Sequence, residues 1–322
     1  MVVLRADPWS PEYGMGFEGG FADEVPLGRA DPFAETSNWS APLSPAHPGR
    51  LSLWFVDGVR RVELRLVAED GSRRLPGLFG SFAAGGVRCD GRALFSDHRL
   101  RRAVILGGGV LPGRVGVSIG RASVTFQPAT DPGTDPDRPL WRLQQLMREE
   151  EGNLAARAAD DSGSIVLVDG PLTFRDPTRA PVVGVVKRYS RQYLQPEQEA
   201  LLARLRAGQR TPLFALGDDQ QPVQRFAWYT RLSDHRPPWH DHAGVVRCEV
   251  RAAVGLEEAV RLADSVSVIL PAYGGHPGDP RSPQNLAPVA ALEVWLRHRM
   301  GDHAILRRAL IEWLAERSEK EG

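Results

Sequence analysis

The most constraining feature of this chain is a pair of apolar runs that each end in the dipeptide Asp-Gly. The run at 51–58 is LSLWFVDG, and the run at 165–170 is IVLVDG. An apolar run that stops at a turn signal predicts a buried β-strand. Asp57 and Asp169 therefore end two such strands, at the edge where α/β sheets bind their ligands. One Asp-Gly alone is usually only a turn, whereas two of them after matching apolar runs indicate a functional site.

A third apolar run, VVGVV at 182–186, ends at Lys187. Lys187 and Lys320 are the only lysines among 40 basic residues, so a lysine after a buried strand is unusual in this arginine-rich chain. A compact ammonium contacts phosphate differently from a planar guanidinium. We expect the three strands to bring two carboxylates and one ammonium to a common edge. This arrangement predicts a site for a metal ion and a phosphate.

Charge and cysteine content exclude several classes of protein. The 40 basic residues are balanced by 40 acidic ones, so binding to a polyanion requires a local patch. Cys89 and Cys248 are the only cysteines, which provides neither a disulfide framework nor a CxxC zinc motif. No apolar stretch approaches the roughly 20 residues of a membrane span. We expect a soluble, cytoplasmic protein without membrane contacts.

The order of the predicted elements indicates an α/β fold. Residues 1–50 are rich in Gly, Pro and aromatic residues such as Trp9, Tyr13 and Phe17. They predict an irregular N-terminal arm that packs on the body of the protein or on another subunit and provides partner or dimer contacts. Residues 51–322 are expected to form one domain, a mixed β-sheet flanked by helices. Its remaining strands are expected at 60–68, 103–109, 114–127, 212–217, 224–232, 244–253 and 266–270, and its helices at 140–159, 196–207, 256–264, 285–300 and 302–317.

The helix at 140–159 offers a third carboxylate. Glu151 lies four residues after Met147 and three before Leu154, so it shares their buried face. Glu150 is close to that face, whereas Glu149 points away. A carboxylate on an apolar face needs a partner. Mg²⁺ or Mn²⁺, which prefer hard oxygen ligands, would be such a partner, although a Glu triplet is also typical of a solvated helix face.

Taken together, these segments resemble the NurA family of DNA-end-processing nucleases. The resemblance lies in FVDGVRR at 55–61, MREEEGNLA at 147–155, VLVDGPL at 166–172 and VGVVK at 183–187. It implies an RNase H-like core, a homodimer, and a hexameric HerA-type ATPase translocase as partner. The implied activity is Mn²⁺-dependent 5′–3′ exonuclease and endonuclease action on DNA ends, in the resection and repair of double-strand breaks.

The resemblance also implies roles for single residues. Asp57, Glu151 and Asp169 would hold two Mn²⁺ ions, with Mg²⁺ as the alternative, and Lys187 would lie near the scissile phosphate. Two such ions typically stand about 4 Å apart. The chain departs from the family at a late tyrosine and histidine, because Ser282 and Ala290 occupy those positions. Asn285 and Gln284, in the segment RSPQNL at 281–286, are the candidates to replace them as polar contacts.

Two other functions remain open. A non-catalytic subunit of a translocase complex would guide DNA without cleaving it, which the missing tyrosine and histidine favour. An RNase H-like enzyme could instead act on RNA or on branched DNA. A zinc cluster formed by His235, His240, Asp241 and His242 is less favoured, because their Pro-rich spacing is typical of a loop between strands. Arg247 and Glu249, on one face of a strand, predict a structural ion pair or a dimer contact.

Overall fold

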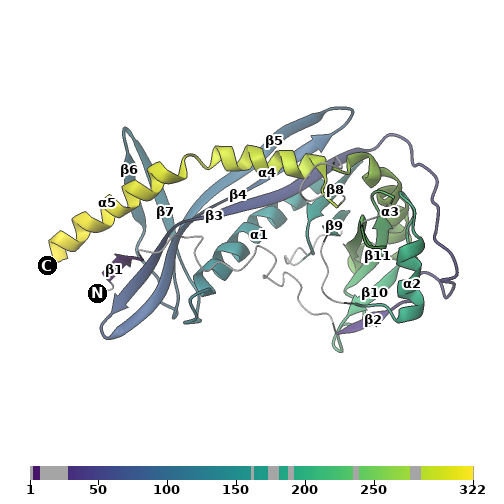
Figure 1. Cartoon of the computed structure of the whole chain (residues 1–322), viewed down its shortest axis with the longest axis horizontal. Helices are drawn as coiled ribbons and strands as arrows, with labels where there is room; N and C mark the ends of the chain where they lie inside the picture. The colour runs from purple at the N-terminus through teal and green to yellow at the C-terminus, as the bar shows by residue number, and fades with distance from the viewer. Residues whose placement is uncertain are drawn as a thin grey trace.

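The computed structural model describes residues 3–7, 28–160, 163–172, 181–187, 192–234, 239–275 and 284–321. Twelve strands in this part of the chain form one mixed sheet, and helices cover both of its faces (Figure 1). This confirms an α/β fold. The strands run in the order β2-β10-β11-β12-β9-β8-β3-β4-β5-β7-β6, with β1 paired to β3. Strand lengths differ widely, and the longest, β3, reaches far beyond its neighbour β8.

The strands have these bounds: β1 Val3–Ala6, β2 Arg29–Asp31, β3 Ser52–Asp70, β4 Arg73–Cys89, β5 Ala93–Leu106, β6 Val115–Ile119, β7 Ala122–Thr130, β8 Ser164–Asp169, β9 Val182–Val186, β10 Phe214–Gly217, β11 Arg225–Arg231 and β12 Val245–Arg251. The α-helices are α1 Arg138–Ala159, α2 Pro196–Arg204, α3 Leu256–Ile269, α4 Ala287–Arg299 and α5 His303–Glu321. Short 3₁₀ turns occupy Ala252–Val254 and Leu270–Tyr273.

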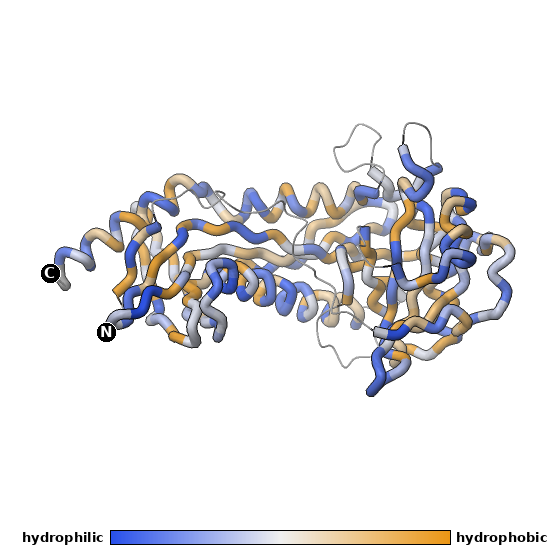
Figure 2. The backbone as a smooth tube through the Cα atoms, turned by 60° about the horizontal axis from the view of Figure 1, so that its bottom comes forward, coloured by the Kyte–Doolittle hydropathy of each residue, from blue (hydrophilic) through white to orange (hydrophobic). Residues whose placement is uncertain are grey.

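The two faces of the sheet are covered by different helices. On one face α1 packs against β3, β4 and β8, and on the other face α3 and α4 pack against the largest apolar cluster. Hydrophobic residues are frequent along the strands and recur along α4 (Figure 2). Gly80 lets Leu143 of α1 approach β4, because a Cβ there would lie 2.6 Å from its Cδ2. Gly85, five residues on, faces α4 instead, where a Cβ would lie 2.8 Å from Leu296 Cδ2.

Several predicted elements are corrected by the structure. The strands expected at 51–57 and 60–68 are one continuous strand, with a register shift between Val62 and Leu64. Strand β4, at Arg73–Cys89, was not anticipated. The strand expected at 266–270 is wrong, because α3 continues to Ile269 and buries Val266 in the core. The antiparallel pairing predicted for the strands near 224–232 and 244–253 is confirmed in β11 and β12.

The expected N-terminal arm contains two strands of the sheet. Val3–Ala6 pairs with β3, and Arg29–Asp31 pairs with β10. Arg5 Nη1 also donates a hydrogen bond to Ser318 Oγ at 2.8 Å, so both ends of the described chain lie together. Trp9, Tyr13 and Phe17 lie outside the described residues. Contact of the arm with a partner stays a prediction.

Candidate metal centre

Asp57 and Asp169 meet because their strands are parallel neighbours. Val56 of β3 is in register with Val168 of β8, so each aspartate is the next residue on its strand. Pairing of β3 with β8 stops at this point, where β8 ends and β3 continues. The prediction that these two carboxylates converge is confirmed, but the prediction that Asp57 ends a strand is wrong, because β3 continues to Asp70.

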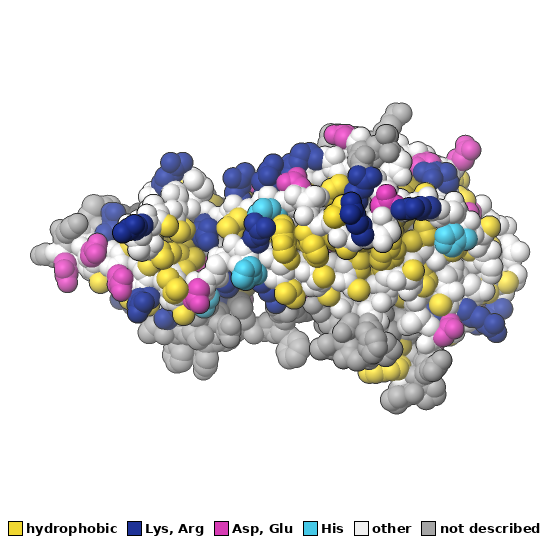
Figure 3. Space-filling view, turned by 90° about the horizontal axis from the view of Figure 1, so that it is seen from above, with side chains coloured by type: hydrophobic (Ala, Val, Ile, Leu, Met, Phe, Trp, Pro, Cys, Tyr) yellow, Lys and Arg dark blue, Asp and Glu magenta, His cyan; other side chains and the backbone are white. Residues whose placement is uncertain are grey.

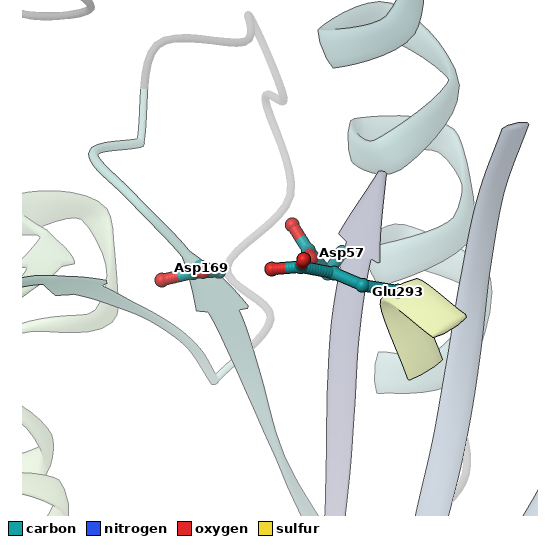
Figure 4. Close-up of side chains that lie close together, drawn as sticks. All are labelled: Asp57, Asp169 and Glu293. Atoms are coloured by element: carbon teal, nitrogen blue, oxygen red, sulfur yellow. The ribbon is translucent and has the colours of Figure 1, made fainter. Parts of the chain in front are cut away.

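Glu293 of α4 completes the group. Asp57, Asp169 and Glu293 each offer a carboxylate oxygen, and these atoms lie within 4.8 Å of one another. Figure 4 shows the carboxyl groups of Asp57 and Glu293 beside each other, with Asp169 at the end of the neighbouring strand. Among the residues that the structure describes, no other group of three or more His, Cys, Asp or Glu side chains lies close enough to hold a metal ion.

Side chains alternate between the two faces of β3, and Asp57 points to the face that α4 covers. Helix α4 can therefore supply the third carboxylate. Phe55, Asp57 and Val59 point to the same face of β3, and the apolar two pack in the cluster that includes Leu292 and Leu296 of α4. Glu293 follows Leu292, and its side chain is almost fully buried on that helix. Its Oε2 also lies 3.4 Å from Arg297 Nη2, one turn later. The packing of α4 on this face therefore carries Glu293 to Asp57.

Lys187 lies at the same edge, as predicted. Asp169 is in register with Val185 of β9, and Lys187 comes two residues later on the same face. Its Nζ donates a hydrogen bond to Asp169 Oδ2 at 2.8 Å. Both side chains keep some exposure, 16% for Lys187 and 20% for Asp169. A substrate group that reaches this edge would therefore meet an ammonium group beside the carboxylates.

The electrostatics of Asp57 fit a cation. Burial raises the pKa of Asp57 well above its ordinary value, and the charges of Asp169, Glu151 and Glu293 raise it further, whereas Lys187 lowers it. Carboxylates crowded in this way repel one another unless a cation neutralises them. Oxygen donors of this kind are the ligands that Mg²⁺ and Mn²⁺ prefer. The three carboxylates thus suit a hard divalent ion, and their donor atoms do not distinguish the metal.

Glu151 lies near this group but on the other face of the sheet. It is fully buried in α1, and its Oε2 accepts a hydrogen bond from Arg148 Nη1 at 2.7 Å. Its Oε1 lies against Gly58, where an added Cβ would overlap it. Glu151 is not one of the three converging residues, so its place as a ligand stays a prediction. Glu150 is bound elsewhere, to Arg101 at 3.2 Å.

Sequence reasoning missed Glu293, although a signal was present. Glu293 lies between Leu292 and Leu296, and four residues after Val289, on the buried face of a helix. This is the pattern that drew attention to Glu151. Near the N-terminus of α4, Gln284 donates a hydrogen bond from Nε2 to Val245 O at 2.9 Å, and Asn285 is buried.

Two further sequence hypotheses concern residues away from this centre. His240, Asp241 and His242 lie in the turn before β12 and form no metal group within the described residues, while His235, like Ser282, lies outside them. The predicted ion pair between Arg247 and Glu249 is confirmed, with Nη2 3.7 Å from Oε2 and both side chains buried.

The comparisons with known proteins add no relative. No protein-family model matches this chain, and no curated protein matches it. Within the described residues, no helix combines the length and apolar character needed to cross a membrane. The case for a function therefore rests on the geometry of the Asp57–Asp169–Glu293 centre and on the sequence motifs that supply it.

Proposed function

We propose that this chain is a divalent-metal-dependent nuclease that hydrolyses phosphodiester bonds in DNA. The observation that carries the proposal is the convergence of Asp57, Asp169 and Glu293, with the Lys187 ammonium bound to one of them. The sequence motifs that supply three of these four residues are the ones that resemble the NurA nucleases.

The order of the strands supports an RNase H-like core. Strands β3, β4 and β5 form an antiparallel meander, the β6–β7 pair and then helix α1 follow, and β8 and β9 run parallel to β3. Without the β6–β7 pair, Asp57 lies on the first strand of this unit and Asp169 on the fourth. The two carboxylates lie on adjacent strands in the interior of the sheet, which supports the proposal of an RNase H-like core.

In this proposal Asp57, Asp169 and Glu293 hold the cation. A bound Mn²⁺ or Mg²⁺ would supply Lewis-acid stabilisation of phosphate charge and make water a better nucleophile. Lys187 Nζ, fixed by Asp169, would donate to a phosphate oxygen and neutralise the negative charge that develops there. Since Lys187 is oriented before substrate arrives, little reorganisation is needed during the reaction.

Exposed basic residues on α4 support binding of a nucleic-acid backbone. Figure 3 looks onto the side that α4 and α5 cover and shows hydrophobic side chains with Lys and Arg near them. The last turn of α4 carries Arg297, His298 and Arg299, all exposed. Such residues contact phosphates without reading sequence. Several narrower proposals rest on the resemblance and the composition. They are Mn²⁺ as the metal, 5′–3′ polarity, DNA-end resection, a homodimer, a HerA-type partner and a cytoplasmic location.

Cleavage assays with variant proteins test this proposal. The purified chain is incubated with Mn²⁺ and with labelled single-stranded DNA, duplex DNA, RNA–DNA hybrid and a branched junction. We expect the wild type to cleave DNA, and we expect Asp57→Asn and Asp169→Asn each to reduce the cleavage rate more than about 100-fold. Such a reduction exceeds the loss of activity usually seen when an outer-shell partner of a metal ligand is removed. The control is Asp70→Asn, the same change at the far end of β3.

Two results would contradict the proposal. Unchanged cleavage in both variants would exclude the Asp57–Asp169–Glu293 centre as the site of hydrolysis. DNA binding without hydrolysis at any Mn²⁺ concentration would instead indicate a subunit that guides DNA. Preferential cleavage of the hybrid or the junction would change the substrate and keep the site.

A further inference from the structure

One buried ion pair lies directly behind the metal centre. Arg148 of α1 donates from Nη1 to Glu151 Oε2 at 2.7 Å, and from the same nitrogen to the backbone oxygen of Asp169 at 2.8 Å. The side chain of Arg148 is 16% exposed and that of Glu151 is fully buried. The pair therefore connects the helix to the residue whose side chain, on the opposite face of β8, enters the centre.

Both Asp-Gly dipeptides make room for this pair. A Cβ on Gly58 would overlap Glu151 Oε1, and a Cβ on Gly170 would lie 3.0 Å from Arg148 Nη2. Gly170 also has a φ of +104°, which L side chains rarely adopt. The glycine after each aspartate thus allows one member of the pair to lie against the strand. The two glycines thus have the same packing role, although β3 continues through Gly58 and only Gly170 follows the end of a strand.

We propose that Arg148 and Glu151 are positioning residues, which fix the backbone at Asp169 relative to Asp57, and that Glu293 is the third ligand in place of Glu151. The proposal rests on the proposed function, because it concerns the same cation. A buried ion pair adds little net stability, since desolvation offsets its attraction. Loss of an outer-shell partner that orients a metal ligand, however, commonly lowers metal affinity about 10–100-fold.

Two placements distinguish this arrangement from a ligand role for Glu151. Glu151 Oε2 is bound to Arg148, and Glu151 approaches β3 from the α1 face. Asp57 and Glu293 meet on the α4 face, within 4.8 Å of Asp169. A residue that acts through Arg148 should share its effect with Arg148, whereas a ligand should act independently of it.

A double-mutant cycle on Mn²⁺ affinity tests the proposal. The dissociation constant is measured by titration with electron paramagnetic resonance of free Mn²⁺, at a temperature where circular dichroism shows every variant folded. We expect Glu151→Gln and Arg148→Met each to weaken binding about 10–100-fold. The double variant should bind Mn²⁺ no less tightly than the single variant with the lower affinity. The effects of two residues that act as one unit are not additive. Arg148→Lys should recover part of the loss.

The same helix offers a matched control. Arg142 and Glu149 form an exposed ion pair at 3.1 Å, and the double variant Arg142→Met/Glu149→Gln should keep wild-type affinity. Asp57→Asn and Glu293→Gln should each abolish binding. If a single variant does not fold, the Mn²⁺ affinity of the Arg148→Met/Glu151→Gln protein tests the proposal instead. In that protein neither charge is buried without its partner.

The outcomes separate this inference from the proposed function. Loss of binding in Glu151→Gln as complete as in Asp57→Asn, with Arg148→Met unaffected, would make Glu151 a ligand and overturn the inference. Wild-type affinity in the Arg148→Met/Glu151→Gln protein would overturn it too. Wild-type affinity in Asp57→Asn and Glu293→Gln would instead contradict the metal centre itself.

Discussion

Asp57→Asn should have opposite effects on the metal-free and the metal-bound protein. Asp57 is buried among the charges of Asp169, Glu151 and Glu293, which together with desolvation raise its pKa. The folded state therefore holds the Asp57 proton to higher pH than the unfolded chain does. By linkage, the metal-free wild type loses stability as the pH rises above the ordinary value of 3.8, until the folded-state pKa is passed. Asparagine cannot ionise, so the variant should lack this loss.

Mn²⁺ should reverse the order of stability. A cation that binds only the folded state at 100 times its dissociation constant adds about 2.7 kcal/mol to the free energy of unfolding. With an unfolding entropy of about 2.1 cal/mol/K per residue, the 322-residue chain should gain about 4 °C in Tm. Asp57→Asn should gain less than about 1 °C, since it cannot hold the ion.

Differential scanning fluorimetry at two pH values, with and without Mn²⁺, measures both effects. The wild type and the Asp70→Asn control should gain the same increment from Mn²⁺, and chelation with EDTA should remove it. An equal Mn²⁺-dependent gain in Asp57→Asn would refute the reasoning. So would a metal-free Asp57→Asn protein that loses stability with rising pH as the wild type does.

The remaining predictions concern stability. Burial would raise the pKa of Glu35, but hydrogen bonds from Arg210 and from a backbone amide, with the Arg210 charge, lower it below 4.5. The Glu35–Arg210 pair should make its full contribution to the free energy of unfolding above pH 4.5. This contribution should disappear as the pH falls through the pKa of Glu35 in the folded state. Glu35→Gln should cost about 3 kcal/mol near neutral pH, measured by urea unfolding, and a loss below about 0.5 kcal/mol would contradict it. Gly80→Ala should lower the free energy of unfolding by about 1–3 kcal/mol, because the new Cβ forces Leu143 to move. Gly116→Ala is the control and should lower it much less, because the space around its Cβ position is open. Equal losses in the two variants would exclude helix packing as the cause.

The two aspartates could be found from sequence because their signal is local. Each follows an apolar run, and the two runs are parallel neighbours in register, so the residues that follow them lie side by side although β3 itself continues. Lys187 follows by the same rule, since β9 is the next strand in register. The pairing of β3 with β8 itself was not visible in the sequence. It depends on which strands become neighbours, and that is decided by packing over the whole chain.

Other features depend on tertiary contacts that no local pattern reveals. Glu293 reaches Asp57 only because α4 crosses the sheet over β3, more than 200 residues away in the chain. Strand β4 has a poor strand sequence, with glycines at 80 and 85, but those glycines admit the two helices that cover it. Residues 266–270 have strand-like composition, yet burial of Val266 in the core keeps them in helix α3. In each case packing overrides local propensity.

The central claim is that three carboxylates from β3, β8 and α4 hold one divalent ion. Anomalous diffraction from a crystal soaked in Mn²⁺ tests it most directly, because the manganese signal locates the ion without reference to activity. We predict a peak within coordination distance of oxygens from Asp57, Asp169 and Glu293, with Glu151 still bound to Arg148. A peak coordinated by Glu151 instead of Glu293, or no peak between the three carboxylates at saturating Mn²⁺, would contradict the account.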